Sequence, residues 1–146
     1  MAVKPKPEGY QTVTPYLAVK DAAGLIDFLK QAFGAEETLR MPRADGGVAH
    51  AEVKIGDSMV MLGEPTEAEA MPGMIHLYVD DADSVYRRAL QAGATSLREP
   101  ENMFYGDRSA GVKDRFGNQW WIATHIEDVQ PDEMKRRSEA FAQHQA

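Results

Sequence analysis

Side chains able to do acid–base chemistry stand at alternate positions in short apolar segments of this chain. His50 and Glu52 are two residues apart within the segment 48–55, which places both on one side of an extended strand. A carboxylate in an apolar pocket has a raised pKa and can act as a base, so His50 and Glu52 are candidate catalytic residues. The alternative is structural, with Glu52 forming a salt bridge or hydrogen bond to Arg108 or Lys54.

Aromatic, thioether and imidazole side chains follow the same alternation in the other segments. Residues 119–124, for example, place Trp120 and Ile122 on one face and Trp121 on the opposite face. An apolar wall with a few polar groups is typical of a ligand pocket. The alternative is a half-buried sheet that a dimer partner covers. The predicted ligand-binding residues are Tyr16, His50, Glu52, Met61, Met74, His76, Tyr78, Tyr105, Arg108, Trp121 and His125.

The motif Phe104-Tyr105-Gly106-Asp107-Arg108 combines aromatic rings, a glycine and paired charges. Gly106 permits a positive φ, and Asp107 or Arg108 would then order the loop. In a binding role, Tyr105 would stack on a ligand and Arg108 would hold a carboxylate or phosphate. The expected partner is therefore a small, partly aromatic or anionic molecule.

An internal repeat organises the elements that carry these residues. The segment 17–22 aligns with 77–82, and in each half an alternating run ends at an aspartate, Asp21 or Asp81, that can cap a helix. Apolar residues then recur at helical spacing up to Gly34 and Gly93, which suit left-handed C-caps. The repeat predicts two tandem βαβββ units.

The fold class expected is α+β, with a curved mixed sheet around a cavity and the helices on the outer face. After each helix we expect three strands, at 37–41, 48–55 and 58–62 and at 95–98, 107–113 and 119–124. The predicted organisation is an N-terminal tail (1–9), a first unit (10–63), a linker (64–73), a second unit (74–128) and a C-terminal helical tail (129–146).

Bulk composition narrows the classes of partner. The 146 residues carry a net charge of −7, which argues against a nucleic-acid backbone as partner. No segment has the apolar length of a membrane span or signal peptide, so we expect a cytoplasmic protein that does not bind membranes. Cysteine is absent, which excludes disulfides, thiolate zinc sites and a cysteine nucleophile.

The paired units resemble the vicinal oxygen chelate superfamily, which includes glyoxalase I, bleomycin-resistance proteins and extradiol dioxygenases. The shared features are Val19-Lys20-Asp21 after the first strand, the helix end Phe33-Gly34-Ala35, and Asp114-Arg115-Phe116-Gly117-Asn118 before the last strand. Within it the chain looks most like the PhnB-like branch. The segments that carry this closer likeness are 14–17, 50–52, 104–108 and 124–128.

Metal-dependent members of that superfamily use four ligands, one from the first and one from the last strand of each unit. The matching positions here are Thr14, Met61, Met74 and Trp121, which supply almost none of the oxygen and imidazole ligands that a hard divalent ion prefers. We therefore expect no cofactor. The alternative is a displaced divalent metal bound by His50, Glu52, His76 and His125.

Three functions remain open on the sequence. The first is a small-molecule-binding protein that lacks the usual metal ligands. The second is an enzyme, a lyase, isomerase or dioxygenase, that uses a cluster of His50, Glu52 and His76 with or without a metal. The third is a protein-interaction role for a homodimer and its C-terminal tail, whose basic run 135–137 otherwise forms a solvated helix face.

Overall fold

The computed structural model describes residues 2–66 and 69–145. Residues 1, 67–68 and 146 fall in the predicted N-terminal tail, linker and C-terminal tail, and lie outside the described part of the chain. The first half contains β1 (Tyr16–Ala18), α1 (Ala22–Phe33), β2 (Glu36–Pro42), β3 (Val48–Ile55) and β4 (Ser58–Gly63). The second half contains β5 (Met74–Tyr78), α2 (Ala82–Gln91), β6 (Thr95–Asn102), β7 (Asp107–Lys113) and β8 (Gln119–His125), and α3 (Pro131–Gln145) follows.

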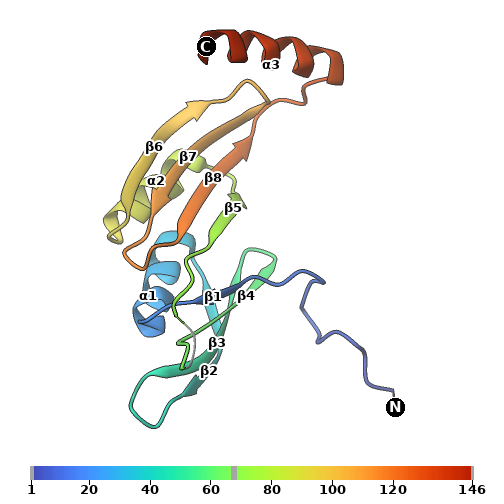
Figure 1. Cartoon of the computed structure of the whole chain (residues 1–146). Coiled ribbons are helices and arrows are strands. Elements are labelled where there is room, and N and C mark those ends of the chain that lie inside the picture. The colour runs from blue at the N-terminus through green and yellow to red at the C-terminus, as the bar shows by residue number, and fades with distance from the viewer. Residues whose placement is uncertain (1, 67–68, 146) are drawn as a thin grey trace.

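The predicted α+β fold of two βαβββ units is confirmed, as two four-stranded mixed sheets rather than one continuous sheet. The strand orders are β1-β4-β3-β2 and β5-β8-β7-β6. In each half the first strand runs parallel to the last one, and the other neighbours are antiparallel. The two halves therefore have the same topology, and Figure 1 shows them as two curved sheets joined through α1 and α2.

Aspartate caps begin both repeated helices, as the sequence predicts. The Asp21 carboxylate accepts a hydrogen bond from the Gly24 amide at 2.9 Å, and Asp81 accepts one from Ser84 at 3.2 Å. Gly34 ends α1 in the left-handed conformation, with φ of 66°. In the second half the cap is Ala92 and not Gly93, although Gly93 has the positive φ.

One hydrophobic core lies where the helices meet each other and the sheets. α1 packs on α2 and β3, while α2 also packs on β6, β7 and β8. Leu25, Leu29, Leu62, Trp120 and Ile122 are among its fully buried side chains. Because one core unites residues of both repeats, burial of apolar surface holds the two halves together.

The alternation along the strands separates core from exposed residues largely as predicted. Val53, Leu62 and Ile122 are buried under the helices, whereas Tyr16 and Tyr78 on the other face are 53% and 65% exposed. Opposite Met41 and Pro42, β3 contains one unpaired residue, Ala49, so that Val48 is buried in place of the expected Ala49.

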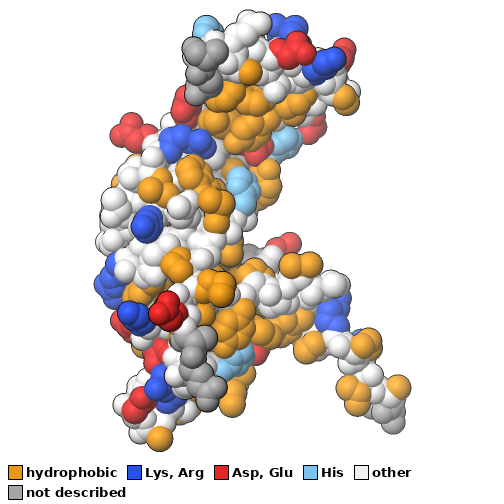
Figure 2. Space-filling model, in the orientation of Figure 1, with side chains coloured by type: hydrophobic (Ala, Val, Ile, Leu, Met, Phe, Trp, Pro, Cys, Tyr) orange, Lys and Arg blue, Asp and Glu red, His pale blue; other side chains and the backbone are white. Residues whose placement is uncertain are grey.

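The side of each sheet turned away from α1 and α2 is called the open face below. Figure 2 shows a hollow between the two halves, with hydrophobic side chains gathered along its walls. We expected the halves to enclose a cavity, but large side chains of these faces, such as Tyr16, Met74 and Tyr78, are exposed in the single chain. Of the described helices, none is long and apolar enough to cross a membrane.

Candidate functional site

Equivalent rows of side chains cross the two open faces. In the first sheet, Leu39, Glu52, Met61 and Tyr16 are register partners on β2, β3, β4 and β1. In the second sheet, Arg98, Gly111, Trp121 and His76 occupy the corresponding places on β6, β7, β8 and β5. The repeat therefore puts an acidic and apolar row on one sheet, and a basic and aromatic row on the other.

A chain of polar contacts surrounds Glu52 in the first sheet. One Glu52 carboxylate oxygen accepts a hydrogen bond from the Tyr10 hydroxyl, and the other lies 2.8 Å from Nε2 of His50. The Tyr16 hydroxyl lies 3.3 Å from Nδ1 of the same imidazole. Three of these four residues come from predicted elements, while Tyr10 precedes the first strand and was missed.

These contacts correct the expected state of Glu52. The hydrogen bonds from Tyr10 and His50 lower the pKa of Glu52, whereas an apolar pocket was expected to raise it. Burial and the Glu52 carboxylate raise the pKa of Tyr10 to about 12. The partners of Glu52 are also different from the expected Arg108 or Lys54, because Arg108 lies in the other sheet with partners of its own.

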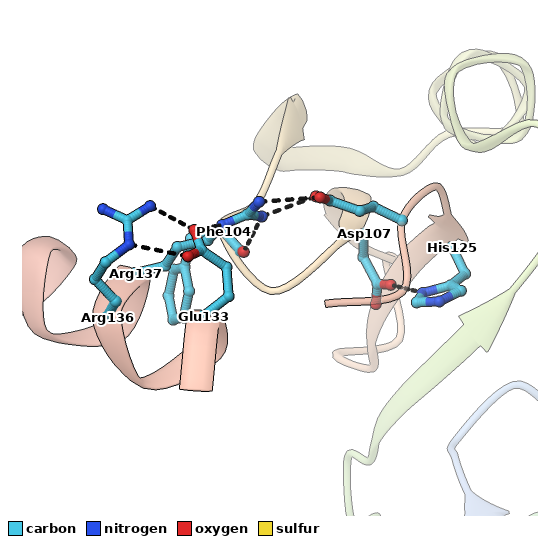
Figure 3. A network of polar contacts seen from close by, with 7 residues as sticks. Phe104, Asp107, His125, Glu133, Arg136 and Arg137 are labelled. Atoms are coloured by element: carbon cyan, nitrogen blue, oxygen red, sulfur yellow. Dashed lines mark hydrogen bonds and ion pairs between the residues drawn. The ribbon is translucent and has the colours of Figure 1, made fainter. Parts of the chain in front are cut away.

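A second network is centred on the buried carboxylate of Asp107. The Tyr78 hydroxyl donates to Asp107 at 2.8 Å, and Nδ1 of His125 lies 2.8 Å from the other carboxylate oxygen, as Figure 3 shows for His125. The hydrogen bonds to Asp107 and then to Asp128 raise the pKa of His125. His76 packs edge-on against Tyr78, with 4.9 Å between ring centroids.

Arg108 serves the fold, since its guanidinium fork is occupied within the chain. Its Nε and Nη2 donate to the two carboxylate oxygens of Asp83 at 2.6 and 2.9 Å, and Nη1 donates to Asn102. This bidentate pair joins β7 to α2. Nearby, Gly106 has φ of 100°, as predicted, and Tyr105 packs edge-on against Phe104.

The C-terminal helix α3 is fastened to the end of the second sheet, as Figure 3 shows. Arg137 donates to Glu127 at 2.8 and 2.9 Å, to Glu133 at 2.9 Å and to the Phe104 carbonyl at 3.1 Å. Arg136 also pairs with Glu133, and the two arginines lower the pKa of Glu133 to about 2. Two of the three residues in the basic run 135–137 are thus paired with acids.

Arg98 belongs to the second open face and was not predicted. Its guanidinium carbon lies 4.9 Å from the centroid of the Trp121 ring, and Nη2 donates to the Ser109 hydroxyl at 2.9 Å. Bulges on both sides of Arg98 interrupt the alternation of β6, so a period of two does not assign its face.

The four positions that match the superfamily's metal ligands do not fit a divalent ion. Thr14 precedes β1 and donates to the Gln11 carbonyl at 3.2 Å, and Met74 is 68% exposed at the start of β5. Met61 and Trp121 lie in the two rows, where thioether and indole are poor ligands for hard ions.

The displaced metal ligands are divided between the sheets. His50 and Glu52 lie together on β3, whereas His76 and His125 lie on β5 and β8. Across residues 2–66 and 69–145, no group of three or more histidine, cysteine, aspartate or glutamate side chains is placed to hold a metal ion. The expected cluster of His50, Glu52 and His76 is likewise not formed within one chain.

A cleft of about 810 Å³ lies at the junction of the halves. Its lining includes Gln11, Val13, Pro15 and the β3–β4 turn from the first half, and β5 with Ser84, Val85 and Arg88 of α2 from the second. Of the predicted ligand-binding residues, His76 and Tyr78 line this cleft. The cleft therefore borders β5, the edge strand of the second sheet, and is continuous with the open face at His76 and Tyr78.

The family follows from comparison with known proteins. A model of the Glyoxalase/Bleomycin resistance protein/Dioxygenase superfamily matches residues 10–122. An uncharacterized protein of Mycobacterium bovis is 37% identical over 147 residues, which cover 92% of this chain and 94% of that protein. The chain belongs to this superfamily.

Solved structures have the same fold. TioX from Micromonospora sp. ML1 is 25% identical, with a TM-score of 0.69 over 80% of this chain and 99% of that one. A superfamily member from Sphaerobacter thermophilus is 24% identical, with a TM-score of 0.64 over 78% of this chain and 96% of that one. Both likenesses extend over most of the two repeats, which supports the assignment of the fold.

Proposed function

We propose that this protein binds a small organic molecule on its open faces and does so without a metal ion. The observation that carries the proposal is that, in each row, aromatic or thioether side chains lie next to polar groups held by hydrogen bonds. Tyr16 and Met61 lie beside the Glu52 network, and Trp121 lies beside Arg98. Apolar walls with a few placed polar groups are the usual composition of a ligand site.

Native mass spectrometry of freshly purified, untagged protein tests this proposal. The expected spectrum contains a small-molecule adduct that survives treatment with a chelator and is lost in Trp121→Ala. Trp121→Ala must keep the parent's circular dichroism for the comparison to hold. Loss of the adduct with the chelator, together with a stoichiometric divalent ion in the parent, would contradict binding without metal.

We also propose that two copies associate and that the chain lies in the PhnB-like branch. Exposed Tyr16, Met74, Tyr78 and Ile126 support association, because large apolar side chains at this exposure are costly in a monomer. The segments 14–17, 50–52, 104–108 and 124–128 support the branch. Light scattering should give twice the chain mass, and Met74→Lys should reduce that mass; a monomeric parent would contradict association.

An enzyme is the second candidate, favoured by the contact of His50 with Glu52. A carboxylate on one imidazole nitrogen orients the ring and supports proton transfer by the other nitrogen. The Tyr16 hydroxyl on that other nitrogen marks where a substrate group would lie. A lyase, isomerase or dioxygenase of this kind should lose turnover in Glu52→Gln while retaining substrate binding. Unchanged turnover in that variant would exclude the dyad.

A further inference from the structure

Arg98 is a cation on the open face of the second sheet, where it lies against the Trp121 ring. Among the residues that the structure describes, its hydrogen-bond partner is the Ser109 hydroxyl, and it forms no ion pair. Its Nε is buried and has no hydrogen-bond partner in that part of the chain. A ligand on the open face cannot reach this enclosed atom, so an anionic ligand would bind the guanidinium through its terminal nitrogens, by charge-assisted hydrogen bonds.

The guanidinium is held in place before any ligand arrives. Trp121 supports it from β8 through a cation–π contact, and Ser109 fixes one end from β7. Ser109 is itself buried, with 1% of its surface exposed. A guanidinium held on two sides loses little conformational freedom on binding, so it is suited to recognise a carboxylate.

The row around Arg98 also supplies aromatic surface. The Trp121 ring lies over Gly111, where an added Cβ would come within 2.4 Å of a ring carbon. On the other flank of β8 from Gly111, His76 of β5 is the register partner of Trp121 and is exposed. A planar ligand can therefore contact indole and imidazole while its anionic group reaches Arg98.

We infer that the ligand of the second open face is a planar, conjugated carboxylate whose anionic group binds Arg98. This inference rests on the proposed function and specifies the ligand's chemistry. It also moves the expected anion contact from Arg108, whose fork Asp83 occupies, to Arg98.

Titration with naphthoate and with its neutral isostere naphthamide, followed by NMR, tests the inference. Trp120 and Trp121 supply two indole N–H resonances, one bonded to Asp114 in the core and one bonded to Gln119. Naphthoate should shift the Trp121 resonance saturably and leave Trp120 unchanged. Naphthamide should bind at least about tenfold more weakly, the factor expected when a charge-assisted hydrogen bond is lost.

Three variants distinguish an effect of the Arg98 guanidinium on affinity from an effect of the protein's net charge. Arg98→Gln should weaken naphthoate binding by about tenfold or more, and Arg98→Lys by less, because lysine keeps the charge but not the planar fork. Arg108→Gln makes the same change in net charge in the same half and should leave affinity unchanged. Thermal unfolding of each variant confirms that it is folded at the titration temperature.

The outcomes distinguish this inference from the proposed function. Equal binding of naphthoate and naphthamide at Trp121, unaffected by Arg98→Gln, would overturn the anion site while leaving a small-molecule site in place. A Trp121 resonance that neither compound shifts would overturn the inference for planar carboxylates. The adduct in the native mass spectrum tests the proposed function independently of both compounds.

Discussion

The guanidinium of Arg98 lies over the indole of Trp121, with 4.9 Å between the guanidinium carbon and the ring centroid. This contact joins β6, an edge strand of the second sheet, to β8 across Gly111 of β7. In the same half, Arg108 is bound at 2.6 Å by Asp83 and holds α2 to the sheet. The two arginines thus have different roles, one structural and one on the open face.

Gly111→Ala tests whether the position of Trp121 depends on the missing side chain. An added Cβ would lie 2.4 Å from the indole, so the ring must move away, at a cost of about 1–3 kcal/mol. Urea denaturation measures that cost, and the Trp121 indole resonance reports the movement. The double variant Gly111→Ala with Trp121→Leu should recover part of the stability. An equal loss with and without the indole would contradict the steric explanation.

Asp114 should be one of the most important polar residues for stability. Its buried carboxylate accepts four hydrogen bonds, from the amides of Phe116 and Asn118, the Asn118 side chain and the Trp120 indole. Asp114→Ala leaves these donors unpaired and should lower the free energy of unfolding by about 2–4 kcal/mol.

Asp57→Ala is the matched control, because Asp57 lies in the equivalent turn of the first half and is exposed. It should change the free energy of unfolding by less than about 0.5 kcal/mol. Similar losses in both variants would show that the turn sequence, and not the buried carboxylate, determines stability.

Much of the fold could be predicted because helix caps and strand alternation, which define the repeat, depend on residues that are close together in the sequence. Asp21 and Gly34 mark the ends of α1 by cap chemistry, which depends on neighbouring residues alone. The end of β6 was predicted too early, near 98, and the observed strand continues through Pro100. β6 is an edge strand, where a proline can be accommodated without removing a ladder bond, and it continues to Asn102.

The site was harder to predict because its contacts depend on register and on segments distant in the sequence. Tyr10 reaches Glu52 across 42 positions, and Asp83 reaches Arg108 across 25. Alternation indicates which face a residue occupies but not which charged group lies opposite it. Glu52 was therefore placed on the correct face with the wrong partners, and Arg98 was missed.

His125 should make stability depend on pH. Its pKa is raised in the folded protein by Asp107 and Asp128, so it contributes stability that is fully present below the unfolded value of about 6.5. That contribution is lost as pH rises through the raised folded value, because a neutral imidazole donates one N–H and not two. The melting temperature of the parent, minus that of His125→Gln, should therefore fall as pH rises.

NMR titration of the His125 ring supplies the direct comparison. Its midpoint should lie above 6.5 in the parent and move down in Asp128→Asn, which removes one of the two acceptors. A midpoint at or below 6.5, or a difference in melting temperature that grows with pH, would contradict this account.

Tyr10 should titrate well above an ordinary phenol. Burial raises its pKa first, and the adjacent Glu52 carboxylate raises it further, to about 12. In Glu52→Gln the titration should begin at lower pH but stay above 10, because the burial remains. Site-specific NMR of the ring measures the shift, and Tyr10→Phe identifies the resonance. A Tyr10 titration that is identical in the parent and in Glu52→Gln would show that the contact is absent in solution.

Small-molecule binding by the open faces is the property on which the proposed function rests. Its most direct test is an NMR map of backbone and side-chain shifts on adding a mixture of small aromatic acids, amides and amines, with a chelator present. Small-molecule binding predicts saturable shifts that gather at Tyr16, Met61, His76 and Trp121 and leave the buried residues of α1 unchanged. Shifts confined to other surfaces, or binding that disappears with the chelator, would contradict it.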